Sequence, residues 1–315
     1  MFNYSQVKKG PFLHFSFFIF SFCILLLAGC GERNEARSYY YSPSFTAEGN
    51  ILHIYGLQSV NKNFIGSELS SAYTETVKTM DPTGASETFI FDTTGDLPYS
   101  MSCSPATTLS YVAFMGDLQS SSFGKITIRN IKPSGQTGLT RAEMVFAAAS
   151  RIRSFDWSAD GTKLVFCNDT GVVTRNWNDY TGATDTTVVA QAGVDFVTWK
   201  YGNRIAFVYA DGGVRHLAVI NSDGTNRVNL PAGATLEKPQ FSPVSTNEVY
   251  GIASGSYCVV DIDAAAPATS EIMANFKGEL PRMAPTGDIV VYSKTGAQSG
   301  IYSLNLSTKV ESTIK

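Results

Sequence analysis

The stretch Ser154-Phe-Asp-Trp-Ser-Ala-Asp-Gly-Thr-Lys-Leu-Val-Phe166 decides the fold, because weaker copies of it recur along the chain. In each copy an apolar residue ends a short alternating run, and a polar turn follows it. A β-branched and aromatic run comes next, which is the pattern of two strands joined by a tight turn. We call these apolar residues the anchor residues. They are Phe45, Cys103, Trp157, Trp199, Phe241 and Met283.

The spacing of the anchor residues indicates the architecture. The last four follow one another at three successive intervals of 42 residues, whereas the first two units are longer, which predicts loop insertions there. The fourth unit shows its remaining strands, His216–Ile220 and Asn226–Leu230, on either side of an Asp-Gly turn. A four-stranded unit of about 42 residues is typical of a propeller blade. The sequence therefore predicts an all-β, six-bladed β-propeller of four-stranded blades. Residues 38–45 are expected either to join the last blade or to complete the first.

A family resemblance favours the same fold. The element Trp157-Ser-x-Asp-Gly-x-x-Leu-x-Phe166 and the turn Val219-Ile-Asn-Ser-Asp-Gly-Thr-Asn226 resemble the PD40 (WD40-like) repeats of the TolB propeller. The resemblance covers most of residues 41–315. It implies a fold rather than an activity, because this repeat serves binding proteins and enzymes alike. TolB carries an α/β domain before its propeller, whereas residues 31–40 alone separate Cys30 from the first blade predicted here.

The N-terminal residues have the pattern of a lipoprotein export signal. Lys8 and Lys9 precede an apolar run, Phe12–Leu27, that is shorter than the about 20 apolar residues of a spanning helix. The run ends in Leu27-Ala28-Gly29-Cys30, which resembles the bacterial lipobox. The resemblance implies cleavage before Cys30 and a diacylglycerol on its thiol, with acyl chains such as palmitate. The alternative is an uncleaved N-terminal segment with an incidental cysteine.

Three parts are predicted: a cleaved signal peptide over 1–29, a lipidated tether over 30–40 and the propeller over 41–315. The tether predicts a place in the cell envelope, with the membrane as one partner. Gly31 rather than Asp follows the cysteine, and the resemblance to lipoproteins then implies the outer membrane if the cell has one and otherwise the outer face of the plasma membrane. No cofactor is predicted beyond the lipid on Cys30. Acidic residues number 27 against 24 basic ones and no basic block occurs, which argues against nucleic acid as a partner.

Residues that carry catalysis are sparse after the signal. His53 and His216 fall in predicted strands of different blades, without companions at metal-ligand spacing. No Gly-x-Ser-x-Gly, phosphate-loop or Cys-x-x-Cys motif occurs. Asp223 and the Asp261-Ile-Asp263 pair are interpreted as turn formers, because too few oxygen ligands accompany them for calcium. We therefore predict neither a catalytic site nor a metal site.

Cys103, Cys167 and Cys258 remain after lipidation, and an odd number at wide spacing is no disulfide framework. We interpret them as small buried thiols. The oxidising compartment permits one bridge, but the sequence selects no pair.

The repeat also predicts a binding site. The residue four positions before each anchor residue is polar or aromatic, whereas the one two positions before it is apolar. Strand alternation places both on the same face as the anchor residue. By resemblance the innermost strand of a blade begins near the axis, so these residues are expected to ring one mouth of the central channel, acidic on one side. The alternative is that they are only the solvated starts of six strands. The ring residues are Tyr41, Tyr99, Arg153, Asp195, Glu237 and Glu279.

These features favour a non-catalytic protein-interaction module that binds another envelope protein. A second hypothesis is a carbohydrate-binding or carbohydrate-active propeller. In that case Tyr41 and Tyr99 would stack on a glycan, and neighbouring carboxylates would serve as acid and base. A third is a structural surface protein without a specific ligand.

Overall fold

The computed structural model describes residues 33–62, 68–92, 100–106, 111–115, 125–131, 142–145, 151–179, 181–199 and 202–315. The predicted signal peptide, the lipidation residue Cys30 and the ring residue Tyr99 lie outside these ranges. Within them, no helix has the length and apolar character needed to cross a membrane.

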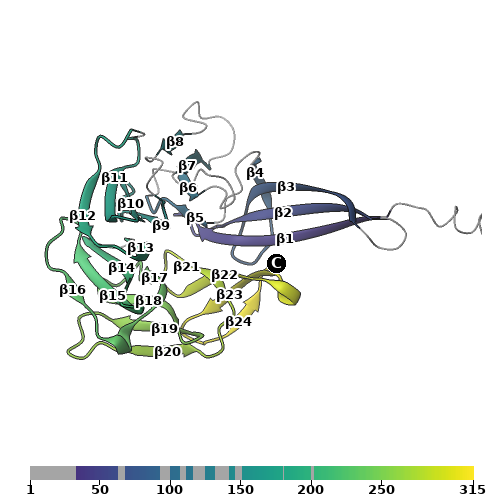
Figure 1. The fold of residues 1–315 in the computed structure, drawn as a ribbon. Coiled ribbons are helices and arrows are strands. Elements are labelled where there is room, and N and C mark those ends of the chain that lie inside the picture. The colour runs from purple at the N-terminus through teal and green to yellow at the C-terminus, as the bar shows by residue number, and fades with distance from the viewer. Residues whose placement is uncertain are drawn as a thin grey trace, which may run out of the picture. The chain divides into compact units, whose positions relative to one another are not determined.

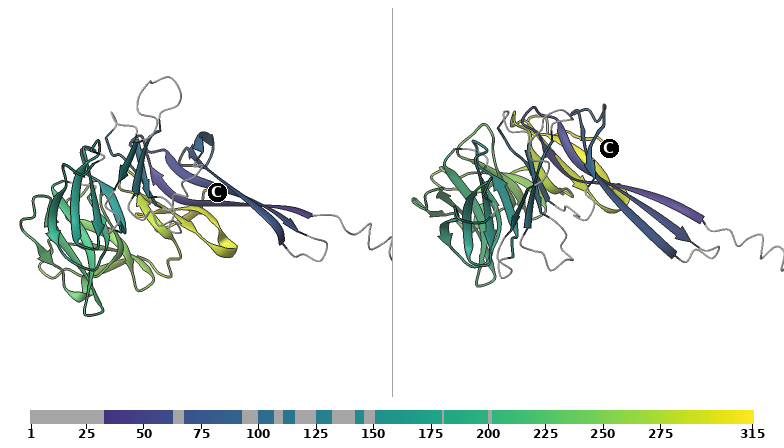
Figure 2. Two further views of the ribbon diagram at one scale, coloured as in Figure 1. Left: turned by 45° about the horizontal axis from the view of Figure 1, so that its top comes forward. Right: turned by 90° about the horizontal axis from the view of Figure 1, so that it is seen from above.

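The described residues form six four-stranded sheets, and each sheet is built from four strands that are consecutive in the chain. Figure 1 shows the sheets placed around a common centre, with β5, β9, β13, β17 and β21 nearest to it. Two further views show the twist of the strands (Figure 2). The protein is thus an all-β, six-bladed propeller, and the predicted fold is confirmed.

The strands of the first three blades are β1 (Arg33–Phe45), β2 (Ile51–Lys62), β3 (Glu68–Met80), β4 (Thr88–Asp92), β5 (Ser100–Cys103), β6 (Tyr111–Met115), β7 (Lys125–Asn130), β8 (Ala142–Val145), β9 (Ser154–Trp157), β10 (Lys163–Asn168), β11 (Gly171–Asn176) and β12 (Thr186–Ala190). Those of the last three are β13 (Val194–Thr198), β14 (Arg204–Asp211), β15 (Val214–Asn221), β16 (Val228–Asn229), β17 (Glu237–Phe241), β18 (Glu248–Ala253), β19 (Ser256–Asp261), β20 (Thr269–Met273), β21 (Glu279–Met283), β22 (Ile289–Lys294), β23 (Gly300–Asn305) and β24 (Glu311–Thr313). Two 3₁₀ turns, η1 (Ala232–Ala234) and η2 (Gly296–Gln298), complete the described elements.

The repeat motif forms the first hairpin of a blade. In blade 3 the amide of Thr162 donates to Asp160 Oδ1 at 3.0 Å, and the amide of Lys163 donates to Ser158 Oγ at 2.9 Å. Gly161 takes a φ of +70°, which a residue without Cβ adopts readily. The turn returns the chain antiparallel, with Leu164 opposite the anchor residue Trp157. All six anchor residues are buried.

Blade 1 has the longest strands, with 13, 12 and 13 residues in β1, β2 and β3. The extra length expected in the first repeat is therefore strand as well as loop. Residues 33–40, counted with the tether in the sequence-based prediction, belong to β1. The chain divides across these strands into unit 1 (Met1–Ser38 and Leu57–Thr74) and unit 2 (Tyr39–Gly56 and Glu75–Lys315). Within unit 1, Lys62 Nζ donates to Glu35 Oε2 at 2.7 Å.

Unit 2 contains the place where blade 6 meets blade 1. Strand β1 is the first strand of blade 1, and β21–β24 make up blade 6. Of the two expected roles for residues 38–45, completing the first blade is the one observed. We call this contact the closing seam. Its buried apolar cluster consists of Phe45, Ile51, Met80, Ala284, Val291 and Ile301.

Candidate functional site

Polar side chains directly before the anchor residues join the innermost strands of neighbouring blades. Ser44 Oγ accepts a hydrogen bond from the amide of Cys103 at 3.3 Å. Gln240 Oε1 accepts one from the amide of Met283 at 2.8 Å. Both side chains are 0–1% exposed. These residues were not predicted as a set, although the repeat places them at a constant offset.

Asp156 is the most heavily bonded member of this column and is fully buried. Its Oδ1 accepts from Ser102 Oγ at 2.8 Å and from the amide of Trp157 at 3.0 Å. Its Oδ2 accepts from Thr198 Oγ1 at 2.9 Å and from the amide of Trp199 at 3.3 Å. These donors come from blades 2, 3 and 4. Because four donors occupy its two oxygens, Asp156 fastens blades together and is not available to a ligand.

The predicted ring residues of blades 3 to 5 lie in one network of ion pairs. Arg153 donates to Asp195 Oδ1 and to Asp169 Oδ1, both at 2.9 Å. Arg215 Nη2 lies 3.4 Å from Asp195 Oδ2, and Arg215 Nη1 lies 3.3 Å from Glu237 Oε1. The acidic side of the mouth is therefore largely neutralised by arginine, and Arg215, on β15, was not among the predicted residues.

Two further ring residues, Glu279 and Tyr41, are described. Glu279 Oε1 accepts from Thr295 Oγ1 at 3.4 Å. Tyr41 is half-buried and packs against a core cluster that includes Leu52 and Phe114. Because Tyr99 lies outside the described ranges, the predicted pairing of Tyr41 and Tyr99 on a glycan stays a prediction.

The alternation used to place the ring on the anchor face does not hold in blades 4 to 6. A register shift falls at the ring residue Asp195 in β13, and shifts interrupt β17 and β21 between the ring position and the anchor residue. Lys238 and Leu280 have φ values of +48° and +49°, and a proline follows each of them. Proline cannot donate to the strand ladder, and a bulge accommodates it. The face prediction is corrected on this point.

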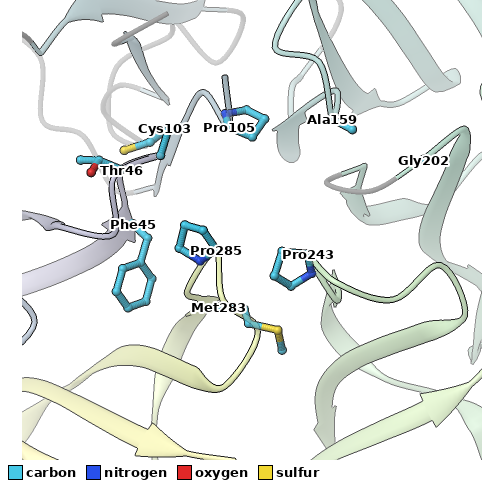
Figure 3. A pocket seen from close by; sticks show the side chains of 10 residues that line it. Phe45, Thr46, Cys103, Pro105, Ala159, Gly202, Pro243, Met283 and Pro285 are labelled. Atoms are coloured by element: carbon cyan, nitrogen blue, oxygen red, sulfur yellow. The ribbon is translucent and has the colours of Figure 1, made fainter. Parts of the chain in front are cut away.

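The opposite mouth of the channel, past the anchor residues, opens into a cavity of about 300 Å³. We call it the axial cavity. Each of five blades contributes to its wall the residue two positions after the anchor residue. That residue is alanine or proline in all five blades where it is described. Figure 3 shows Pro105, Ala159, Pro243 and Pro285 around a common opening. The described lining contains no Asp, Glu, Lys, Arg or His. The repeated Ala and Pro were visible in the sequence but were not predicted as a site.

A polar pocket of about 330 Å³ adjoins the axial cavity and shares Ala159 and Gly202 with it. It lies between blades 3 and 4. Asp160, Lys163 and Asn203 contribute exposed polar groups to its wall. An apolar opening at the axis thus continues outward into a polar one.

The two histidines lie in different blades, as predicted. His53 is fully buried, and its Nε2 lies 2.9 Å from Glu87 Oε1, while Nδ1 has no described hydrogen-bond partner. Burial lowers the pKa of His53 to about 4, despite the neighbouring Glu87 carboxylate. His216 stacks on Tyr209 with ring centroids 5.2 Å apart.

Cys103, Cys167 and Cys258 are free and buried, which agrees with their interpretation as core thiols. Burial raises the pKa of Cys167 to about 12, so its thiolate is not formed near neutral pH. Among the described residues, no three His, Cys, Asp or Glu side chains gather as metal ligands would. The described site offers shape and charge for binding.

No protein-family model matches the sequence, and no curated protein matches it. Solved structures do match. A TolB protein from Agrobacterium tumefaciens has a TM-score of 0.56 at 13% identity, over 73% of this chain and 84% of that one. A nidogen–laminin complex matches with a TM-score of 0.56 at 6% identity, over 88% of this chain and 92% of that one. An oligogalacturonate lyase from Vibrio parahaemolyticus matches with a TM-score of 0.51 at 11% identity, over 90% of this chain and 79% of that one. At such identities the likeness shows the fold alone: this is a TolB-like six-bladed propeller.

Proposed function

We propose that this chain is a lipid-tethered envelope protein whose propeller binds a segment of another envelope protein at the axial cavity. The observation that carries the proposal is the lining of that cavity. Alanine, proline and glycine at successive blades form an uncharged opening of about 300 Å³, which suits an apolar side chain of a partner. The nidogen–laminin complex among the fold neighbours is consistent with a propeller that meets another protein.

Two further features support this mode of binding. The wall is held by inner strands that the buried column around Asp156 fastens together, so the opening is formed before the partner arrives. The polar pocket between blades 3 and 4 offers Asp160, Lys163 and Asn203 beside the apolar opening. The partner that fits the axial cavity and the polar pocket together places an apolar side chain in the cavity and its peptide backbone across the pocket. The tether at Cys30 would hold the propeller at the membrane surface.

The test uses site-specific photocrosslinking of the full chain in cells. A photoreactive residue replaces Pro243 or Pro285 in the cavity wall, and replaces Val310, which is 56% exposed outside it, as the reference. We expect the same envelope protein to be captured at both wall positions and not at the reference position. Ala159→Trp, which fills the cavity, should abolish capture, whereas Ala265→Trp on an exposed turn should not. Capture that survives Ala159→Trp, or that also occurs from position 310, contradicts the proposal.

A further inference from the structure

A second, smaller cavity lies at the other end of the innermost strands. Its volume is about 60 Å³, and its wall comes from the strand starts of blades 2 to 6. Three of the described lining residues are cationic, namely Arg153, Lys238 and Arg282, and none is a carboxylate. We call it the cationic pocket. It lies apart from the axial cavity, with which it shares no lining residue.

The cations of this pocket differ in how they are neutralised. Arg153 is paired with Asp169 and Asp195. Lys238 and Arg282 are partly buried, and neither has an ion pair or side-chain hydrogen bond with any described residue. Arg153 also keeps one donor unused, because its Nε is buried without a partner. A partly buried cation without a counter-charge is costly, so the pocket holds unused capacity for negative charge.

The nearest carboxylates along the chain do not remove this capacity. Glu237 and Glu279 precede the bulges and are exposed, and neither lines the pocket. Glu237 lies against Arg215, and Glu279 accepts from Thr295. The residue after each glutamate has a left-handed backbone, at Lys238 and Leu280, and both of these side chains line the pocket. Such a conformation is strained in a non-glycine residue and persists only where its surroundings hold it.

The size of the pocket limits its ligand. One water molecule needs roughly 10–15 Å³ of cavity volume. The cavity volume of about 60 Å³ therefore accommodates a group of a few heavy atoms. Ser100 and Ser154 add hydroxyl groups to the wall. A planar carboxylate accepts hydrogen bonds from arginine, lysine and hydroxyl donors at once, and charge-assisted bonds of this kind are the strong ones. We propose that the cationic pocket binds a carboxylate, either at the end of a polypeptide or on a free small acid.

The binding test follows the thermal unfolding temperature of the full chain at constant ionic strength. The probes are acetate, N-acetylglycylglycine with a free carboxylate, the amide of that dipeptide, and phosphate. A ligand that binds only the folded state raises the unfolding temperature with saturation. We expect both carboxylates to do so and the amide to do nothing. A stronger effect of the dipeptide than of acetate assigns the pocket to a polypeptide end, and the reverse assigns it to a free acid.

Variants locate the effect. Lys238→Met and Arg282→Gln should each weaken carboxylate binding about ten- to hundredfold, the equivalent of one charge-assisted hydrogen bond. Lys309→Met removes an exposed lysine between β23 and β24 that lines none of these pockets, and it should leave binding unchanged. Absence of any saturable carboxylate effect, an effect of phosphate alone, or equal weakening by Lys309→Met and Lys238→Met would each overturn the proposal. Because these residues do not line the axial cavity, such failure leaves the proposed partner binding untouched.

Discussion

The seams between blades 2, 3 and 4 and the closing seam between blades 6 and 1 bury polar groups in different ways. In the first region Asp156 accepts four hydrogen bonds and has no unused oxygen. In the second, an apolar cluster does most of the packing, and the nearby His53 is buried with one ring nitrogen unbonded. The comparison teaches that the seams of one ring can be held by a hydrogen-bonded carboxyl group at one place and by apolar packing at another. The two regions should therefore respond differently to mutation and to pH.

The largest effect is expected from Asp156→Ala. Removal of the carboxylate leaves donors from three blades buried without an acceptor, so we expect a loss of about 3–5 kcal/mol in the free energy of unfolding. Urea unfolding at pH 7 measures it. Asp223→Ala, which alters only an exposed turn, serves as the control and should cost less than about 1 kcal/mol. Equal losses from the two variants would mean that Asp156 does not fasten the blades together.

A somewhat smaller effect is expected from acid at the closing seam. His53 in the folded protein takes up its proton only near pH 4, whereas the unfolded chain does so near the ordinary value of 6.5. The unfolded state thus binds more protons between these values, and stability falls as the pH drops through that window. The expected loss is about 3 kcal/mol between pH 7 and pH 4.

Urea unfolding of His53→Gln across that range checks the effect. The variant should lack this part of the pH dependence, whereas His216→Gln should retain it. If His53→Gln follows the same curve as the unmodified protein, the loss of stability in acid does not come from His53.

The smallest effect of the three is expected from Gly84→Ala, also at the closing seam. Gly84 has a φ of +83°, and a Cβ there would lie 2.6 Å from the backbone oxygen of Ile314 in blade 6. Gly49 has a similar φ of +87° but open space around it. We expect Gly49→Ala to cost about 1 kcal/mol through backbone strain, and Gly84→Ala about 2 kcal/mol because blade 6 must also move. Thermal unfolding compares them, and identical losses would mean that the seam is loose at this point.

The regular repeat made the blades predictable. The 42-residue spacing located the anchor residues of blades 3 to 6, and all four are buried. Each of them lies in the innermost strand of its blade or directly after that strand. The long strands of blade 1 were not predicted, because a longer interval does not say whether the added residues are strand or loop. The bulges at Lys238 and Leu280 also escaped prediction, although Pro239 and Pro281 were available as a signal.

The candidate site was predicted less well than the fold. Offset counting found Arg153, Asp195 and Glu237, which do lie together, but it could not find Arg215, which reaches them from another strand. Ion pairing between strands depends on side-chain reach, which spacing along one strand does not contain. The axial cavity is different in kind. Its Ala and Pro residues keep a fixed offset from the anchor residues, so the same repeat that predicted the fold contained this signal too.

The order of strands within each blade has a consequence for how the chain acquires its structure. Every blade is made of four consecutive strands, so most pairing joins residues that are near in sequence, and such hairpins form within microseconds. The closing seam alone joins an early stretch of the chain to a late one, which requires the largest loss of chain entropy. Blades can therefore form in the order of synthesis, with ring closure as the last and slowest step.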